Sequence, residues 1–116
     1  MCSSDLNQKV VEIVHARANG YCEKCGGPGI SEQMALHHRK LKSRGGQDTP
    51  ANLMLVHHGC HNLSTDSIHL KPAYAESKGW ICPSWRNPTE HPMTMPDGSI
   101  VLLLDDGAMH MLLEGE

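Results

Sequence analysis

The pattern of apolar and polar positions predicts a helix at the start of the chain. Apolar residues recur at helical spacing from Leu6 to Val14, and Gly20 follows where a helix would end. Residues 5–18 are therefore predicted to form an amphipathic helix. Arg17 stands near its end, where it could contact DNA or cover a solvated helix terminus.

Two short strands and a helix are predicted next, in the order strand, loop, strand, helix. Residues 34–40 and 53–56 have the short apolar runs of strands, and residues 41–50 contain the Gly45-Gly46 pair and read as a loop. From Cys60 onward the chain is polar enough to begin a surface helix.

The remaining elements are a short helix and a hairpin. Residues 72–78 begin with proline and are followed by glycine, a pattern typical of a helix. Residues 99–113 hold two apolar runs separated by Asp-Asp-Gly, a strong hairpin signal. Between them, Trp80 and Trp85 are expected to anchor an irregular stretch on the core. The elements together predict a small α+β fold.

Length and composition add a need for extra stabilisation. A chain of 116 residues has room for one domain with a modest core, and without any Phe that core has few bulky side chains. No apolar run reaches the roughly 20 residues that span a bilayer, and the N-terminus is too polar for a signal peptide. We expect a cytoplasmic protein without membrane contact, in which a bound metal would help to stabilise the fold.

Two half-sites of equal spacing predict a structural zinc ion. Cys22 and Cys25 form a C-x-x-C pair, and His57 and Cys60 repeat that spacing, which supplies the four soft ligands that structural zinc prefers. His58 is a weaker candidate than His57 for the imidazole ligand. The alternative is that Cys22 and Cys25 are small buried residues or a redox pair.

Charge is divided unevenly along the chain. All ten Lys and Arg lie in residues 1–86 against seven acidic residues, whereas residues 87–116 hold six acidic residues and no Lys or Arg. The net charge of -3 therefore hides a basic first part. The densest basic cluster is Arg39, Lys40, Lys42 and Arg44. It predicts a phosphate-binding patch, with a merely solvated basic loop as the alternative.

Histidines next to this patch suggest catalysis. The series His37-His38, Asn52 and His61 lies in the stretch LHHRKLKSRGGQDTPANLMLVHHGCH, downstream of CEKC. In these motifs the chain resembles the HNH endonuclease family, whose core is the ββα-metal fold. The resemblance covers about residues 17–70 and is nearest to small phage-type members, in which a segment like GWICPSWRNP also recurs.

The resemblance implies a role for each motif residue. His38 would be the general base, and His37 and His61 would hold one catalytic divalent ion, which could be Mg²⁺, Mn²⁺, Ni²⁺ or Zn²⁺. Asn52 would hold the loop beside His38, and the basic patch would contact the phosphates of DNA, expected to be double-stranded. Neighbouring residues on a regular strand face opposite sides, so the strand must end or twist at this pair for both to reach one phosphate.

Some family members have a further metal ligand four residues after the position of His61, where this chain has Thr65. His69 could replace it or contact DNA, although a surface or packing role is favoured.

The predicted organisation is an HNH nuclease domain with zinc knuckles at residues 1–86 and an acidic C-terminal extension at residues 87–116, in the same domain or as an appendage. The extension could contact a partner such as a phage DNA-packaging enzyme. The alternative function is a non-catalytic, zinc-stabilised module that binds nucleic acid. A zinc deaminase is excluded, because its His-x-Glu and Pro-Cys-x-x-Cys motifs do not occur.

Overall fold

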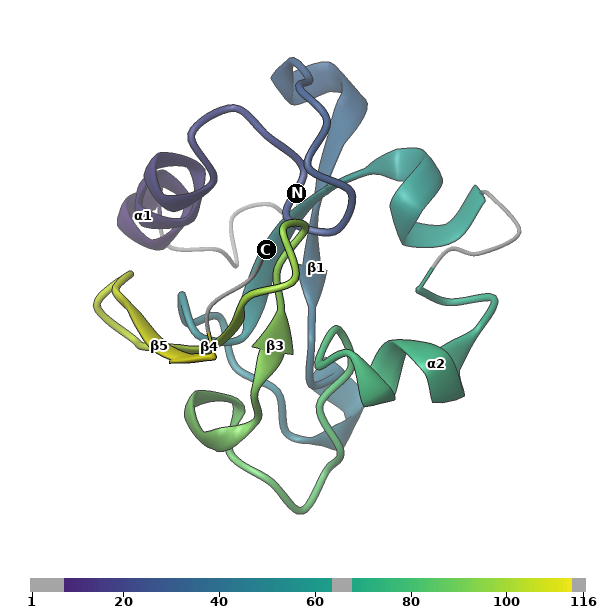
Figure 1. The fold of residues 1–116 in the computed structure, drawn as a ribbon, viewed down its shortest axis with the longest axis vertical. Helices are drawn as coiled ribbons and strands as arrows, with labels where there is room; N and C mark the ends of the chain where they lie inside the picture. The colour runs from purple at the N-terminus through teal and green to yellow at the C-terminus, as the bar shows by residue number, and fades with distance from the viewer. Residues whose placement is uncertain (1–7, 64–67, 114–116) are drawn as a thin grey trace.

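The N-terminal helix begins the part of the chain that the computed structural model describes, residues 8–63 and 68–113 (Figure 1). Helix α1 (Gln8–Ala18) agrees with the predicted helix where the two overlap, and residues 5–7 lie outside the described residues. It buries Val14 and Ala18 and ends before Gly20, whose φ of 84° is left-handed backbone that glycine adopts without strain. No helix among the described residues is long and apolar enough to cross a bilayer.

A two-stranded antiparallel sheet follows, as the sequence predicted. Strand β1 (Met34–His38) pairs with β2 (Leu53–His57), with His37 opposite Met54 and His38 opposite Leu53. Strand β1 ends two residues earlier than predicted, because the Lys40 amide binds the Asn52 side chain instead of continuing the ladder. After β2 the chain forms a π-helix, η4 (Gly59–Leu63), where a surface helix was expected.

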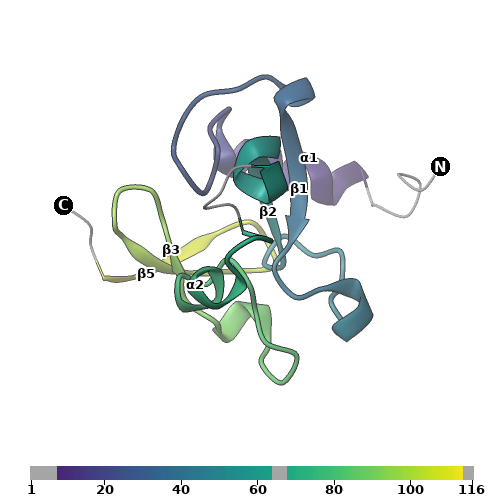
Figure 2. The ribbon, with the colours of Figure 1, turned by 90° about the vertical axis from the view of Figure 1, so that its right-hand side faces the viewer.

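A second sheet is built from the C-terminal residues (Figure 2). Its strands are β3 (Met93–Thr94), β4 (Ile100–Leu103) and β5 (Met109–Leu113), in that order. The hairpin predicted over residues 99–113 is confirmed as β4 and β5. Strand β3 was not predicted, since two residues carry too little pattern to recognise.

Short helices complete the fold. Helix α2 (Pro72–Ser77) lies within the predicted range 72–78 and appears to the right of β1 in Figure 1. Single 3₁₀ turns occupy Ser31–Gln33, Lys42–Arg44 and Pro88–Glu90. The α+β class is thereby confirmed.

One hydrophobic core joins both sheets and the first helix. Val14 of α1, Leu53 of β2 and Val101 of β4 are all buried and belong to the same cluster. The acidic C-terminal segment therefore contributes strands to the core that also supports β1 and β2.

Of the two tryptophans predicted to anchor the core, the structure confirms Trp80 and contradicts Trp85. Trp80 is buried, with 7 % of its surface exposed, whereas Trp85 is 75 % exposed. The expectation that Trp85 anchors the core is wrong, because it lies on a surface turn beside Arg86.

Candidate functional site

The four predicted zinc ligands come together where the turn at residues 22–27, called the knuckle, meets β2 and η4. The ligand atoms of Cys22, Cys25, His57 and Cys60 all lie within 4.8 Å of one another. The Cys25 Sγ is 3.4 Å from the His57 Nδ1. This set, the zinc cluster, has the three thiolates and one imidazole of a closed structural site.

Backbone groups prepare two of these ligands for a cation. The His57 Nε2 donates to the Pro28 carbonyl at 3.0 Å, so the Nδ1 lone pair faces the sulfurs. Burial raises the pKa of the Cys22 thiol, but N–H donors at Cys25, His57 and Lys24 outweigh it, and the pKa is lowered overall. The knuckle therefore favours a thiolate at Cys22.

The thiol of Cys60 shows why a cation is needed. Burial and the negative charge of Cys22 raise the pKa of Cys60 to about 12. Thiolates this close cannot all ionise at neutral pH unless a positive charge lies among them. The donor set thus fits zinc, which takes sulfur and imidazole ligands and supplies that charge.

A second cluster contains only imidazoles. His37, His61 and His69 also offer ligand atoms within 4.8 Å of one another. Their ring centres are 5.1 Å apart for His37–His61, 5.3 Å for His37–His69 and 4.5 Å for His61–His69. We call this set the histidine cluster.

His69 reaches this cluster through backbone pairing. The His69 amide donates to the His61 carbonyl at 3.1 Å, and the Ile68 amide donates to the Cys60 carbonyl at 2.9 Å. The two Nε2 atoms of His61 and His69 are consequently 2.9 Å apart. The sequence favoured a surface or packing role for His69, because nothing in it shows the chain returning beside Cys60 and His61.

The orientation of His37 is fixed by Trp80. Its Nε2 donates to the Trp80 carbonyl at 2.6 Å, which leaves the Nδ1 lone pair free to bind a cation. Burial is the main cause that lowers the pKa of His37 to about 3, and nearby His61 adds to it. Burial also lowers the pKa of His61. Both rings are therefore neutral at neutral pH, the form that binds metal.

His38, the next residue on β1, has a separate partner. Its Nε2 lies 2.7 Å from the Asp48 Oδ1, and Lys42 Nζ is 3.6 Å from the other carboxylate oxygen. Since a carboxylate accepts, the Nε2 donates, and the Nδ1 keeps a lone pair that can accept a proton. His37 is 1 % exposed and the His38 side chain 20 %, consistent with alternating sides of a strand. Asp48 was missed because nothing distinguishes it from other polar residues of the loop.

Asn52 closes the loop next to His38. Its buried side chain accepts from the Lys40 amide at 2.7 Å and donates to the carbonyls of Lys40, at 3.1 Å, and Gln47, at 2.9 Å. These bonds join the end of β1 to the loop that carries Asp48. The contacts are of the kind that the family resemblance implied for this residue.

Arg39 corrects the predicted phosphate patch. The side chain is fully buried and cannot reach DNA from that position. It donates to the carbonyl groups of Gly79, Ala51, Pro88 and His91. The guanidinium is a structural tie between the end of β1 and the later segments. Of the other patch residues, Lys42 and Arg44 are exposed and Lys40 is half-buried.

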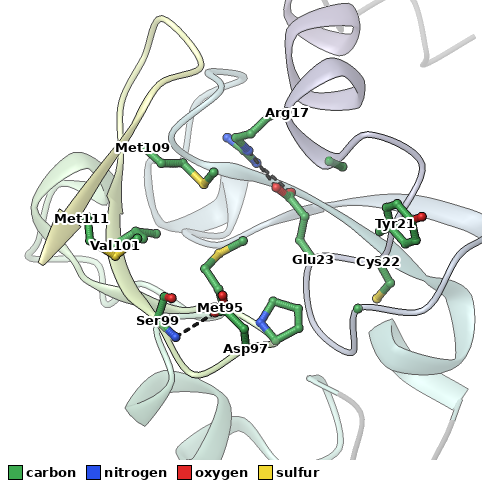
Figure 3. A pocket seen from close by; sticks show the side chains of 13 residues that line it. Arg17, Tyr21, Cys22, Glu23, Met95, Asp97, Ser99, Val101, Met109 and Met111 are labelled. Atoms are coloured by element: carbon green, nitrogen blue, oxygen red, sulfur yellow. Dashed lines mark hydrogen bonds and ion pairs between the residues drawn. The ribbon is translucent and has the colours of Figure 1, made fainter. Parts of the chain in front are cut away.

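Arg17 also differs from both sequence expectations. It forms a buried ion pair with Glu23 at 2.8 Å and donates to the carbonyls of Pro50 and Leu53 at 2.6 Å. The pair lies at the edge of an apolar hollow of about 330 Å³ between α1, the knuckle and β5 (Figure 3). None of the three cluster histidines lines this hollow. Of its charged side chains, Arg17 and Glu23 bind each other and Asp97 accepts from the Ser99 amide. The hollow is therefore separate from the candidate catalytic residues.

One comparison with known protein families matches the part of the chain that holds most of these residues. Residues 22–67 match the family model described as HNH endonuclease. No curated protein and no solved structure matches the chain. The matched segment contains the whole zinc cluster, the pair His37-His38, Asn52 and His61. The similarity to the HNH endonuclease family therefore covers residues 22–67, the segment that holds these candidate residues.

Proposed function

We propose that this protein is a metal-dependent endonuclease that hydrolyses the phosphodiester bonds of DNA. The observation that carries the proposal is that two oriented groups of histidines occur together, one inside the matched HNH segment and one mostly inside it. One is His38, whose Nε2 is held by Asp48, and the other is the histidine cluster beside it in sequence.

His38 serves as the general base. Its Nδ1 takes a proton from a water molecule as the water attacks phosphorus, and the Asp48 carboxylate stabilises the resulting imidazolium. Asp48 fixes which ring nitrogen carries the hydrogen before the reaction begins. Asn52 supports both residues by holding the loop that joins them.

His37, His61 and His69 would hold the divalent ion that the family uses. When bound there, such an ion supplies Lewis-acid stabilisation of the scissile phosphate and the leaving oxygen. The residues fit a metal because Trp80 orients His37 and because burial keeps His37 neutral. A site with three protein ligands keeps positions open for substrate.

Substrate binding falls to exposed cations near His38. Lys42 and Arg44 are exposed on the loop that follows β1, and Lys40 is half-buried beside them. Contacts from these side chains to phosphates give affinity for double-stranded DNA without reading its sequence. The zinc cluster has a different task, since it connects the knuckle to the β-strand and to the π-helix that carries His61.

A plasmid-nicking assay tests the proposal. Wild-type protein and its His38→Ala variant are compared with Mg²⁺, Mn²⁺, Ni²⁺ or Zn²⁺ and with EDTA, and exposed His110→Ala serves as the matched control. Loss of the base is expected to slow nicking by about 100- to 10,000-fold. If no metal supports nicking by protein that still binds DNA, the non-catalytic zinc module is the correct function.

A further inference from the structure

Trp85 is a large side chain that the core does not use. It is 75 % exposed, while Trp80, five residues earlier, is 7 % exposed. Tryptophan at an exposed position is typical of contact surfaces, because the indole offers a large rigid face at little entropic cost.

The turn that carries Trp85 is tied to the end of β1. The Arg86 amide donates to the Pro83 carbonyl at 3.1 Å, and the Cys82 thiol donates to the Arg86 carbonyl at 3.3 Å. The Cys82 amide in turn donates to the Arg39 carbonyl at 2.7 Å. Because Arg39 directly follows His38, these bonds hold the backbone of the turn that carries Trp85 next to the end of β1.

A cation accompanies the indole. The guanidinium carbon of Arg86 lies 4.9 Å from the centre of the Trp85 ring, within the range of a cation–π contact. The pair presents an aromatic face and a positive charge side by side. This is the combination that single-stranded nucleic-acid sites use for bases and phosphates.

A polar hollow of about 280 Å³ opens between this pair and the loop after β1. Its lining includes Lys40, Gln47, Thr49 and Asn52 as well as Trp85 and Arg86. Asp48, which binds His38, lies in sequence between two of these lining residues. The hollow is therefore adjacent to the loop that positions the general base.

The lining suits one nucleotide rather than an apolar ligand. Lys40 and Arg86 are cations for a phosphate, the indole offers a stacking face, and Gln47 and Thr49 are polar. One carboxylate, Asp105, also lines the hollow, where it repels phosphate and can accept from a base amino group. A base inside a perfect duplex is stacked on both faces by its neighbours. Only an unpaired base can therefore stack on the indole of Trp85.

We propose that this hollow binds one unpaired nucleotide of the DNA substrate, with its base stacked on Trp85 and its phosphate near Lys40 and Arg86. The inference rests on the proposed function, because it assigns a substrate class to the same nuclease site. It implies that the enzyme prefers DNA with unpaired nucleotides beside the cut.

Binding measurements with the full, zinc-loaded chain test the inference without cleavage. A labelled oligothymidine and a fully paired duplex of the same length are titrated in the His38→Ala background, in parallel with tryptophan fluorescence. We expect oligothymidine to quench the emission and bind more tightly than the duplex does. Trp85→Leu should weaken oligothymidine binding by about 5- to 150-fold, the range for loss of one base–aromatic stack. Trp85→Phe should restore most of it.

Tyr21→Leu is the matched control, since Tyr21 is 49 % exposed and lines the other hollow. It should leave binding unchanged, and melting curves should show that all variants fold. The inference would be overturned if Trp85→Leu bound oligothymidine as tightly as its parent His38→Ala protein does. It would also be overturned if that parent protein bound the duplex as tightly as oligothymidine.

The two proposals fail separately. A chain that nicks plasmid, with oligothymidine binding insensitive to Trp85, keeps the nuclease and loses the nucleotide site. If the chain binds oligothymidine through Trp85 but does not nick plasmid with any of the tested metals, the nucleotide site is kept and the nuclease function is rejected.

Discussion

His38 and Asp48 form a side-chain pair in which Nε2 and the carboxylate oxygen are 2.7 Å apart. The pair leaves only Nδ1 of the imidazole able to accept a proton. In the proposed mechanism, Asp48 is therefore a positioning residue that acts through His38.

Replacing Asp48 tests this role. Asp48→Ala should lower kcat by about 10- to 100-fold, the usual effect of removing a group that orients a site residue, while KM changes little. Asp48→Glu should recover part of the loss because it restores a carboxylate. Exposed Glu32→Gln serves as a control for lost surface charge. If kcat is unchanged in Asp48→Ala, the carboxylate does not orient the base.

The histidine cluster predicts which ions bind. Its three donors are imidazole nitrogens, which suit Zn²⁺, Ni²⁺ and Co²⁺, whereas Mg²⁺ prefers oxygen ligands. Calorimetric titration of protein already carrying its structural zinc should show one further site for Ni²⁺ or Co²⁺ and much weaker binding of Mg²⁺.

The same titration examines His69. Its replacement by Ala should lower the affinity for Co²⁺ at least about tenfold and change the visible spectrum of the bound ion. His58→Ala, an exposed histidine outside both clusters, should change neither. An unaltered Co²⁺ affinity in His69→Ala would reduce the site to His37 and His61.

Zinc removal should unfold the domain. The free energy of structural zinc binding, roughly 10–16 kcal/mol in small zinc peptides, is comparable with or larger than the roughly 5–15 kcal/mol by which a domain is stable. Cys60→Ser should release zinc in a colorimetric assay and abolish the cooperative melting transition followed by circular dichroism. A metal-free variant with the wild-type transition would show that the zinc cluster does not stabilise the fold.

Substitution of Arg39 should affect stability, whereas substitution of its exposed neighbours Lys42 and Arg44 should affect DNA binding. Arg39→Ala leaves several buried carbonyl groups without donors and should cost about 3 kcal/mol or more of unfolding free energy. Lys42→Ala and Arg44→Ala should change stability by less than about 0.5 kcal/mol. Each should instead weaken DNA binding and lower its salt dependence by about one unit of slope. Wild-type stability in Arg39→Ala would refute the buried tie.

Acid should destabilise, through His37, protein that carries its structural zinc but no ion at the histidine cluster. Its pKa is about 3 in the folded protein, below the ordinary value of 6.5. The unfolded chain therefore binds the proton first as pH falls. Stability from this residue is complete above about pH 6.5 and declines toward pH 3, by up to about 1.4 kcal/mol per pH unit. Denaturant titrations should show that the free energy of unfolding falls less between pH 7 and pH 4.5 in His37→Gln than in wild type.

Local patterns in the sequence were sufficient for most of the fold. Apolar spacing predicted α1, β1, β2 and the β4–β5 hairpin, because each is encoded by nearby residues. Strand β3 and the burial of Arg39 depend on segments that meet only after folding, so they were not predicted.

The residues of the candidate site likewise fall into those that the sequence predicted and those that only the structure revealed. Spacing indicated the zinc ligands, and the family resemblance indicated His37, His38, Asn52 and His61. Asp48 and His69 join them through contacts across the loop and across residues 60–69, which a linear pattern cannot display. The phage-type assignment and a packaging-enzyme partner stay predictions.

The short helix η4 carries Cys60 of one cluster and His61 of the other at consecutive positions. Occupation of the first site fixes the backbone from which the second is built, so the two binding equilibria are thermodynamically linked. Such linkage is reciprocal: if zinc at the thiolates raises the affinity of the imidazoles for their ion, that ion raises the affinity for zinc by the same factor. The proposed nuclease activity would then depend on the free zinc concentration, although the zinc ion at the thiolates does not itself contact the substrate.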